Sequence, residues 1–539
     1  MKPRVILAVL ALVPRLVAGQ SLSLDARTDE PTWFAQWSAL FPRGDLPRGL
    51  PSAPGATPML LLPVPGSGLF WTLGNPATLG LDLPSGRTDF TFALGGQSGA
   101  YRRPLDSERA RLSRMSALSW GQISPRVTML GRVTVDRESN PRSSEAVFID
   151  SYGSSPFLTT DTTTSPMRRD RTRLEGISQW NFGKWLVGLT LGYESRDHTT
   201  TDAGVVRSVR RAMPGAVVGL ARRSGTLTVG VHGAFRYRTE TFRLSERSYD
   251  TFVYDLQGYR DVGLTDVILQ YYRRLNERVP AVGAGVSGMQ GGLAWSVGGE
   301  RIWRRESQTR QQANDPLEDR WDAEGWRTGL SVEPSLGSDR LRLLGQVRYH
   351  ALNGRGDRAL DSADVVFTAE ESLLEGRIEG RLLPVERGWT GVAAVVVARE
   401  ARTRSDSIAA IRSDISTLRV SLQVEAGRTM GGTLIALTLG FAHYQPTAEI
   451  PDPRVRGAVY QRLFAPELDI RSRGASPFSI GALARRTLSP RSAVWLGARY
   501  ERAAPAASLS PFGFGVEGTR TAWSLTGGVT LGIEGPGGR

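Results

Sequence analysis

The sequence predicts an all-β protein: a transmembrane antiparallel β-barrel of about 18 strands, with 14 or 16 strands as alternatives. Three observations lead to this prediction. Apolar and polar residues alternate with a period of two along most of the chain, as in residues 521–533, where Trp523, Leu525 and Val529 share one face. Short turns join the strands at one end and long polar connections join them at the other. The chain also opens with a secretory signal.

Residues 1–19 have the pattern of a signal peptide. Lys2 and Arg4 form the charged start, an apolar run follows, and the small residues 17–19 precede an expected cleavage at Gln20. The apolar run is too short to cross a membrane as a helix. The chain has no cysteine, so we expect neither a disulfide framework nor a lipid anchor on an N-terminal cysteine.

Residues 20–87 form an N-terminal segment that we expect to be partly helical and partly extended, either as a plug or as a periplasmic extension. Its aromatic residues fall on one face of a helix that ends at Pro42. This face could pack on or inside the barrel, or it could form a plug or an interfacial helix. The residues of the plug helix are Trp33, Phe34, Trp37 and Phe41.

Residues 88–533 are the predicted barrel, and residues 534–539 are a C-terminal tail. Seven hairpins with tight turns are expected from 174–180 and 185–193, 212–220 and 227–237, 282–286 and 293–303, 326–332 and 341–349, 374–382 and 389–397, 418–426 and 435–441, and 478–484 and 494–500. The sixth turn is expected at residues 427–431. Long polar connections are expected at 136–171, 240–278, 305–323, 353–364 and 445–476, with a helix in 262–275.

The two faces of the strands predict which side chains line the lumen. In residues 418–426, Leu418 and Leu422 share one face, while Arg419 and Glu425 share the other. An arginine near the middle of the bilayer would cost about 2–4 kcal/mol, so the charged face must point inward. These charges could be ion pairs that stiffen a wet wall, or they could form a selectivity constriction. The candidate lumen residues are Arg236, Arg348, Glu375, Arg377, Glu379, Arg419 and Glu425.

Aromatic residues sort by strand end, which indicates two interfacial belts. The expected outer belt consists of Tyr193, Tyr237, Trp303, Trp326, Tyr349, Tyr500 and Trp523, and the periplasmic belt of Trp180, Trp185, Trp295 and Trp389.

The net charge of +14 comes almost entirely from arginine. Because it is spread along an exported chain, we expect no nucleic-acid partner. We expect outer-membrane lipid, lipopolysaccharide phosphates held by loop arginines, and the barrel assembly machinery as partners.

A resemblance to a known group comes from Asn75-Pro76-Ala77, just before the first strand. This element resembles one near the start of outer-membrane barrels related to long-chain fatty-acid transporters, and the chain is similar to large, uncharacterised outer-membrane barrel families. The resemblance implies an N-terminal segment lodged in the barrel and a hydrophobic substrate. The chain departs from the transporter group by its larger number of strands and by ending on Glu534–Arg539 without a terminal aromatic residue.

No catalytic, metal-binding or cofactor motif is present in the sequence. The four histidines are widely separated, and no nucleophile motif occurs. We therefore predict a non-enzymatic protein of the outer membrane of a Gram-negative-type bacterium, a channel or transporter for small or hydrophobic solutes. The alternatives are a scaffold or accessory barrel of a secretion or surface-attachment system, and an outer-membrane barrel hydrolase.

Overall fold

The computed structural model describes residues 89–102, 110–124, 126–143, 147–148, 160–161, 165–202, 205–244, 272–312, 315–334, 341–360, 363–382, 388–406, 411–449, 475–489, 492–505 and 520–534. The strands are β1 (Asp89–Arg102), β2 (Ala110–Ser124), β3 (Val127–Ser143), β4 (Val147–Phe148), β5 (Thr160–Asp161), β6 (Ser165–Phe182), β7 (Trp185–Asp202), β8 (Val205–Ser224), β9 (Leu227–Leu244), β10 (Tyr272–Gln290), β11 (Leu293–Gln312), β12 (Asp315–Pro334), β13 (Leu341–Leu360), β14 (Ala363–Leu382), β15 (Gly388–Asp406), β16 (Ile411–Met430), β17 (Thr433–Glu449), β18 (Ala475–Ser489), β19 (Ser492–Pro505) and β20 (Arg520–Glu534). Within these ranges there is no helix long and apolar enough to cross a membrane.

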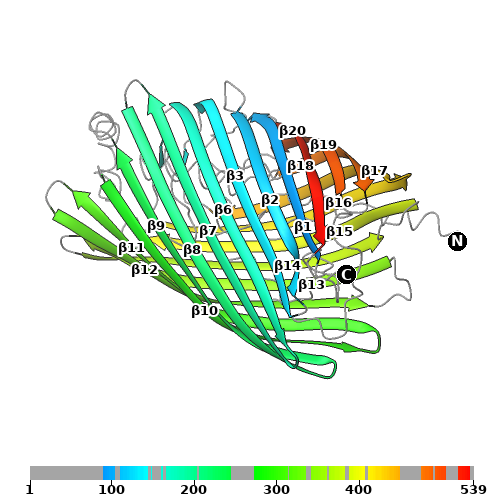
Figure 1. Ribbon diagram of the computed structural model, residues 1–539. Helices are drawn as coiled ribbons and strands as arrows, with labels where there is room; N and C mark the ends of the chain where they lie inside the picture. Colours follow the sequence, from blue (N-terminus) through cyan, green and yellow to red (C-terminus); the bar gives the residue numbers. More distant parts are fainter. Residues whose placement is uncertain are drawn as a thin grey trace.

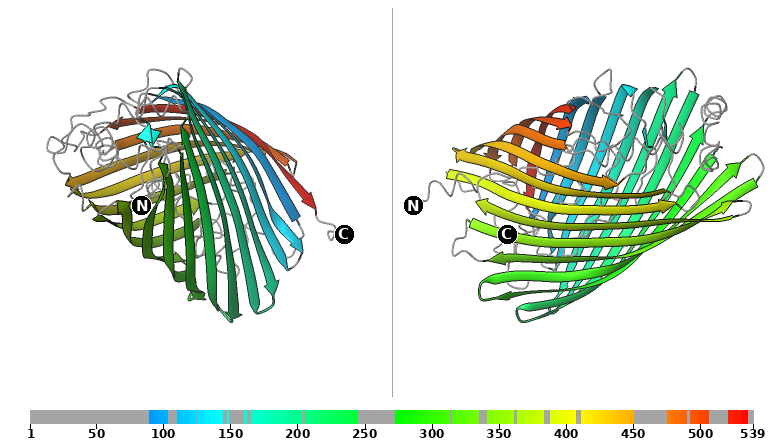
Figure 2. Two further views of the ribbon diagram at one scale, coloured as in Figure 1. Left: turned by 90° about the vertical axis from the view of Figure 1, so that its left-hand side faces the viewer. Right: turned by 180° about the vertical axis from the view of Figure 1, so that it is seen from behind.

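Eighteen of these strands form one closed antiparallel barrel, which confirms the predicted fold class. Each barrel strand pairs with the next in the chain, and β1 pairs with β20 from Asp89↔Glu534 to Arg102↔Thr521, which closes the wall. Figures 1 and 2 show the tilted strands around this wall, with β1 beside β20. The short β4 and β5 pair only with each other.

Glycines make the tight turns at one rim of the barrel. The turn between β10 and β11 is Gly291-Gly292 and the turn between β16 and β17 is Gly431-Gly432, all with positive φ. Two residues with positive φ match the twist of a hairpin, and glycine adopts this conformation without a steric cost. The expected turn at 427–431 is wrong, because β16 stays paired as far as Met430↔Thr433. Both ends of the barrel, in β1 and β20, lie at the same rim as these turns.

Two of the expected long connections are strands instead. β11 and β12 remain paired up to Gln312↔Asp315, and β13 and β14 up to Leu360↔Ala363. Residues 305–323 and 353–364 are therefore almost wholly extended. Trp321 helps to explain this, because its indole lies across glycines 354 and 356 of the neighbouring strand.

The other three expected connections are strands at their described ends, and the rest lies largely outside the described residues. β3 runs to Ser143 and β6 begins at Ser165, β9 runs to Leu244 and β10 begins at Tyr272, and β17 runs to Glu449, so the bounds 136–171, 240–278 and 445–476 are wrong. For the helix expected in 262–275, only the end can be compared: Tyr272–Leu275 belongs to β10, so that part of the prediction is wrong. The signal peptide, the N-terminal segment with Trp33, Phe34, Trp37 and Phe41, and the Asn75-Pro76-Ala77 element also lie outside the described residues.

Exposure alternates along the strands and separates an outer from an inner face. On β9, Val229, Val231 and Phe235 are exposed, whereas Arg236 and Arg238 are buried. Because the wall is closed, the exposed apolar side chains form its outside and the alternate positions form its inner wall. The same alternation runs through β16, where Leu418, Val420 and Leu422 are exposed and Arg419 is buried.

Aromatic side chains on the outside mark two levels. At the turn rim, Trp185 and Trp389 are exposed, with the guanidinium groups of Arg222 and Arg428 5.6 and 5.9 Å from their ring centres. At the other level the exposed residues are Tyr193, Trp303, Trp326, Tyr349, Tyr500 and Trp523. On β7, the segment between the two levels is about as long as a tilted transmembrane strand of roughly 9–11 residues. We call the segments between the levels the membrane band and those beyond the second level the strand extensions.

Candidate functional site

The inner wall contains buried arginines and glutamates in nearly equal numbers, beside buried apolar residues such as Leu275, Val279 and Ile302. The buried arginines are Arg171, Arg211, Arg236, Arg238, Arg304, Arg327, Arg377, Arg419 and Arg499, and the buried glutamates are Glu194, Glu240, Glu277, Glu300, Glu306, Glu371, Glu375 and Glu379. Taking a charge out of water is costly unless an opposite charge and hydrogen bonds compensate it. The arrangement of these charges across strands therefore decides how the wall is held together.

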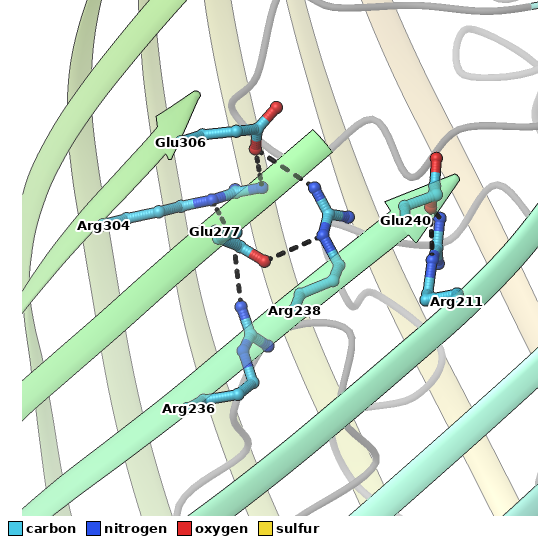
Figure 3. A network of polar contacts seen from close by, with 7 residues as sticks. All are labelled: Arg211, Arg236, Arg238, Glu240, Glu277, Arg304 and Glu306. Carbon is cyan, nitrogen blue, oxygen red and sulfur yellow. Dashed lines mark hydrogen bonds and ion pairs between the residues drawn. The ribbon is translucent and has the colours of Figure 1, made fainter. Parts of the chain in front are cut away.

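The first charged group joins β9, β10 and β11, and we call it the β9–β11 cluster: Arg236, Arg238, Glu277, Arg304 and Glu306. The Glu277 carboxylate forms ion pairs with Arg236 and Arg238, each at 3.0 Å, and with Arg304. Glu306 lies 3.1 Å from Arg238 and 3.2 Å from Arg304. Glu277 and Glu306 are cross-strand partners; Glu277 lies between three guanidinium groups, and Glu306 contacts two of them (Figure 3).

The second charged group lies on β6, β7 and β8. Arg171 is the cross-strand partner of Arg196, and Arg196 is the cross-strand partner of Arg211. We call these three residues the arginine row. Arg171 makes a bidentate pair with Glu194, at 3.0 and 3.1 Å, and Arg211 pairs with Glu240 (Figure 3). Within the described contacts, the carboxylate that Arg196 approaches is that of Glu194, at 3.8 Å, and Asp136 of β3 continues the row opposite Arg171.

A third group extends across four strands, from β9 to β12. His232 Nε2 lies 3.2 Å from Glu300, and Glu300 accepts a hydrogen bond of 3.1 Å from Arg327. The imidazole reaches β11 by lying directly over Gly283 of β10, where a Cβ atom would be 2.0 Å from the ring. Any side chain at this position would clash with the imidazole, so Gly283 is what allows His232 to reach Glu300.

Most of the predicted lumen residues gather on β13 to β16. Arg419 of β16 donates a hydrogen bond of 2.9 Å to Glu375 of β14, reaching past β15. Arg348 is the cross-strand partner of Glu375, and its guanidinium lies 3.4 Å from the Gln346 amide oxygen. Arg377 contacts Glu379 on its own strand.

Two predicted lumen residues lie apart from that group. Arg236 belongs to the β9–β11 cluster, several strands away. Glu425 is half-buried and sits nearer the turn rim of β16, opposite Val392 and Thr438. The predicted set therefore does not form one constriction among the described residues.

The sequence prediction missed Glu277 and Glu306 because both fall in stretches assigned to long connections. It also missed Glu194, Arg196 and Arg211, which lie beyond the apolar part of their strands. The available signal was the recurrence of charge at every second position, as in Arg236-x-Arg238-x-Glu240 and Arg304-x-Glu306. No group of three or more metal-ligating side chains occurs within the described ranges.

Comparisons with family models and with curated proteins find no match, and comparison with solved structures finds likenesses at low sequence identity. No family model matches the sequence, and no curated protein matches it. Among solved structures, the copper transporter OprC aligns with a TM-score of 0.39 and 10% identity over 89% of this chain and 84% of that chain. The ferric yersiniabactin uptake receptor FyuA from Yersinia pestis aligns with a TM-score of 0.42 and 10% identity over 84% and 81%. The siderophore receptor PirA from Pseudomonas aeruginosa aligns with a TM-score of 0.35 and 8% identity over 82% of this chain and 80% of that chain.

Proposed function

We propose that the chain is an outer-membrane channel or transporter of a Gram-negative-type bacterium. The observation that carries this proposal is the closed 18-stranded wall, apolar and exposed outside between two aromatic levels and charged inside. A wall with these two faces suits hydrocarbon on one side and a polar interior on the other. Barrels of 16–18 strands are wide enough to enclose an aqueous channel.

The burial of the inner wall favours a gated transporter over a permanently open pore. The arginines and glutamates of the β9–β11 cluster are almost completely removed from solvent and bound to one another. Wall side chains of an open aqueous channel would be hydrated. Passage of a solute along this part of the wall therefore requires a change that exposes it.

The direction of the barrel follows from its two rims. The glycine turns and both ends of the barrel share one rim, and we assign this rim to the periplasm, as in outer-membrane barrels with short periplasmic turns. A peptide tag inserted near Gly337 should then be shielded on intact cells, whereas a tag near Asp452 should be labelled. Equal labelling of both tags would contradict the assignment.

The inner wall and the sequence resemblance favour different classes of substrate. Ionic side chains suit small polar or charged solutes, whereas the Asn75-Pro76-Ala77 element supports a hydrophobic substrate. A scaffold or accessory role is the alternative for a barrel that does not conduct, and lipid hydrolysis by the purified barrel would instead favour the hydrolase alternative.

The decisive experiment is the conductance of the purified, folded barrel in a planar bilayer. We expect small or intermittent currents from the full chain and larger, steadier currents after deletion of residues 20–68, because we propose that this segment plugs the lumen. The heat-dependent shift in gel mobility should be the same for both proteins, which controls for folding. If neither form conducts, the transport proposal fails and the scaffold role is favoured.

A further inference from the structure

The turn rim carries exposed positive charge at three successive hairpins. Arg126 lies in the turn between β2 and β3, Lys184 in the turn between β6 and β7, and Arg222 near the end of β8, just before its turn into β9. Backbone hydrogen bonds join these hairpins, from Asn181 N to Arg126 O and from Arg223 N to Lys184 O, both at 2.7 Å. The three hairpins are therefore neighbours along the rim, and each contributes one exposed cation.

Arg222 is held on the outer face by an aromatic row. Phe182, Trp185 and Arg222 are successive cross-strand partners on β6, β7 and β8, so they share one face of the sheet. Phe182 is 56% exposed and Trp185 is 45% exposed, which places this face outside the barrel. The guanidinium lies 5.6 Å from the centre of the Trp185 ring, within the range of a cation–π contact. The positive charge is thereby fixed at the aromatic level of the turn rim.

The strands around these turns supply no acidic side chain near the rim. The parts of β2 to β11 that lie next to the turns are residues 119–131, 176–192, 214–233 and 281–299, and they contain no aspartate or glutamate. On the described strands, acidic residues reach this rim at the seam, where Asp89 and Glu534 pair, and at Glu333 of β12. The arc from β2 to β11 is therefore positive without a balancing negative charge from its own strands.

An arginine at the other aromatic level provides a comparison. Arg301 lies 4.7 Å from the ring centre of its cross-strand partner Trp326, which is the arrangement of Arg222 on Trp185. The Arg301 guanidinium is also paired with Glu324, at 2.6 Å. Arg222 has no ion pair among the described residues, so its donors are available to a ligand outside the protein.

We propose that Arg126, Lys184 and Arg222 form a binding site for the phosphate of an anionic phospholipid, in the leaflet that meets the turn rim. Phe182 and Trp185 lie at the level of the headgroups, where aromatic rings are favoured. A guanidinium offers a fork of donors to a phosphate, and basic residues near a membrane surface attract anionic lipids. The proposal rests on the outer-membrane placement proposed above, with this rim in the periplasm, and not on transport.

The wall beside the row favours a lipid over an acidic protein segment as the ligand. On β8, Leu220 and Val218 follow Arg222 at every second position, and they are 44% and 56% exposed on the same outer face. A phosphate at Arg222 can therefore continue into acyl chains that cover these apolar side chains. An acidic peptide would leave the apolar part of the surface uncovered.

The test is a titration of the full-length barrel in detergent with phosphatidylglycerol, followed by native mass spectrometry and by the unfolding temperature, which rises if the folded state binds the lipid. We expect saturable binding of phosphatidylglycerol and binding at least about tenfold weaker for phosphatidylcholine, whose headgroup has no net charge. Equal binding of the two lipids overturns the proposal. Displacement of phosphatidylglycerol by inorganic phosphate or by a polyglutamate peptide at equal charge also overturns it, because the site would then take a free anion or an acidic protein segment.

Matched variants locate the binding. Arg222→Gln and Lys184→Gln should each weaken phosphatidylglycerol binding about fivefold and leave phosphatidylcholine binding unchanged. Arg223→Gln is the control, because it removes the same charge at the next residue, whose cross-strand partner Thr228 is buried on the inner face. Equal losses in Arg222→Gln and Arg223→Gln would show an effect of net charge alone and refute the site. The heat-dependent shift in gel mobility should be the same for all variants, which controls for folding.

Conductance measured on the same preparations separates this inference from the proposed function. A barrel that binds phosphatidylglycerol through Arg222 but never conducts refutes transport and leaves the lipid site standing. A barrel that conducts but shows no preference for phosphatidylglycerol refutes the lipid site and leaves transport standing.

Discussion

The β9–β11 cluster and the arginine row arrange their charges in opposite ways. The cluster has three arginines and two glutamates, whereas the row has three arginines, of which Arg171 and Arg211 are bound to Glu194 and Glu240. In the cluster, Glu277 and Glu306 are opposed at the centre, and every arginine lies within 3.2 Å of a carboxylate. In the row the arginines are opposed at the centre, with Asp136 opposite Arg171 at one end and Glu240 opposite Arg211 at the other, and within the described contacts Arg196 approaches a carboxylate, that of Glu194, only to 3.8 Å. The order of charges across the strands, and not only the number of arginines and glutamates, therefore determines which of these side chains come into close contact.

The strongest test of this comparison removes the centre of the cluster. Glu277→Gln would leave three buried guanidinium groups around one remaining carboxylate, and we expect a loss of about 3–5 kcal/mol in the free energy of unfolding. The measurement is equilibrium unfolding in urea, followed by tryptophan fluorescence. Glu324→Gln is the control, because that carboxylate is outside the wall and 59% exposed, so its loss should cost far less. Equal effects of the two changes would show that the cluster does not hold the wall.

A second test places an arginine where no carboxylate and no water is available. Leu422 is exposed on the outer face of the membrane band. Leu422→Arg should cost about 2–4 kcal/mol if the position is near the middle of the bilayer. Gln423→Arg, at the next position and therefore on the opposite face, should be mild. If both changes reduce the yield of folded, heat-modifiable barrel equally, the assignment of the strand faces is wrong.

A third test asks whether the free space above Gly283 is needed for the contact between His232 and Glu300. A Cβ atom at Gly283 would meet the ring of His232 and lie 2.7 Å from the backbone oxygen of Gly299. Gly283→Ala should therefore displace the imidazole from Glu300 and cost about 1–3 kcal/mol, as overpacking does. Gly233→Ala is the matched control, since a Cβ atom there meets nothing within 4 Å. Comparable unfolding free energies for the two variants would show that the histidine adjusts without loss.

The sequence predicted the membrane band well because its two faces meet different solvents. Leu418, Val420 and Leu422 alternate with polar residues, and this contrast marks both the strand and its orientation. The strand extensions have no such contrast, because both faces carry charged side chains: Arg305 and Asp322 are exposed outside, whereas Arg304 and Glu306 are buried inside. Residues 305–323 were therefore expected to be a connection, although Arg305 and Asp322 lie on paired strands with their charges 3.7 Å apart.

The candidate site was less predictable because it depends on register. Arg171, Arg196 and Arg211 are far apart in the chain, and only the strand pairing brings them into one row. The periodicity of a single strand indicates which face a residue occupies but not which residue of the next strand it meets. The lumen-facing set taken from single strands therefore contained Arg236 but not its partner Glu277.

The smallest expected effect is the most specific one. Arg196→Gln removes a loose contact with Glu194 and, at the same time, relieves repulsion from the arginines on both sides. These terms oppose each other, so we expect the free energy of unfolding in chloride buffer to change by no more than about 0.5 kcal/mol, with a slight gain favoured. Arg238→Gln, which loses close contacts with Glu277 and Glu306, should instead cost at least about 1.5 kcal/mol. If Arg196→Gln lowers the free energy of unfolding as much as Arg238→Gln does, Arg196 stabilises the wall as strongly as the cluster arginines, despite its longer distance from a carboxylate.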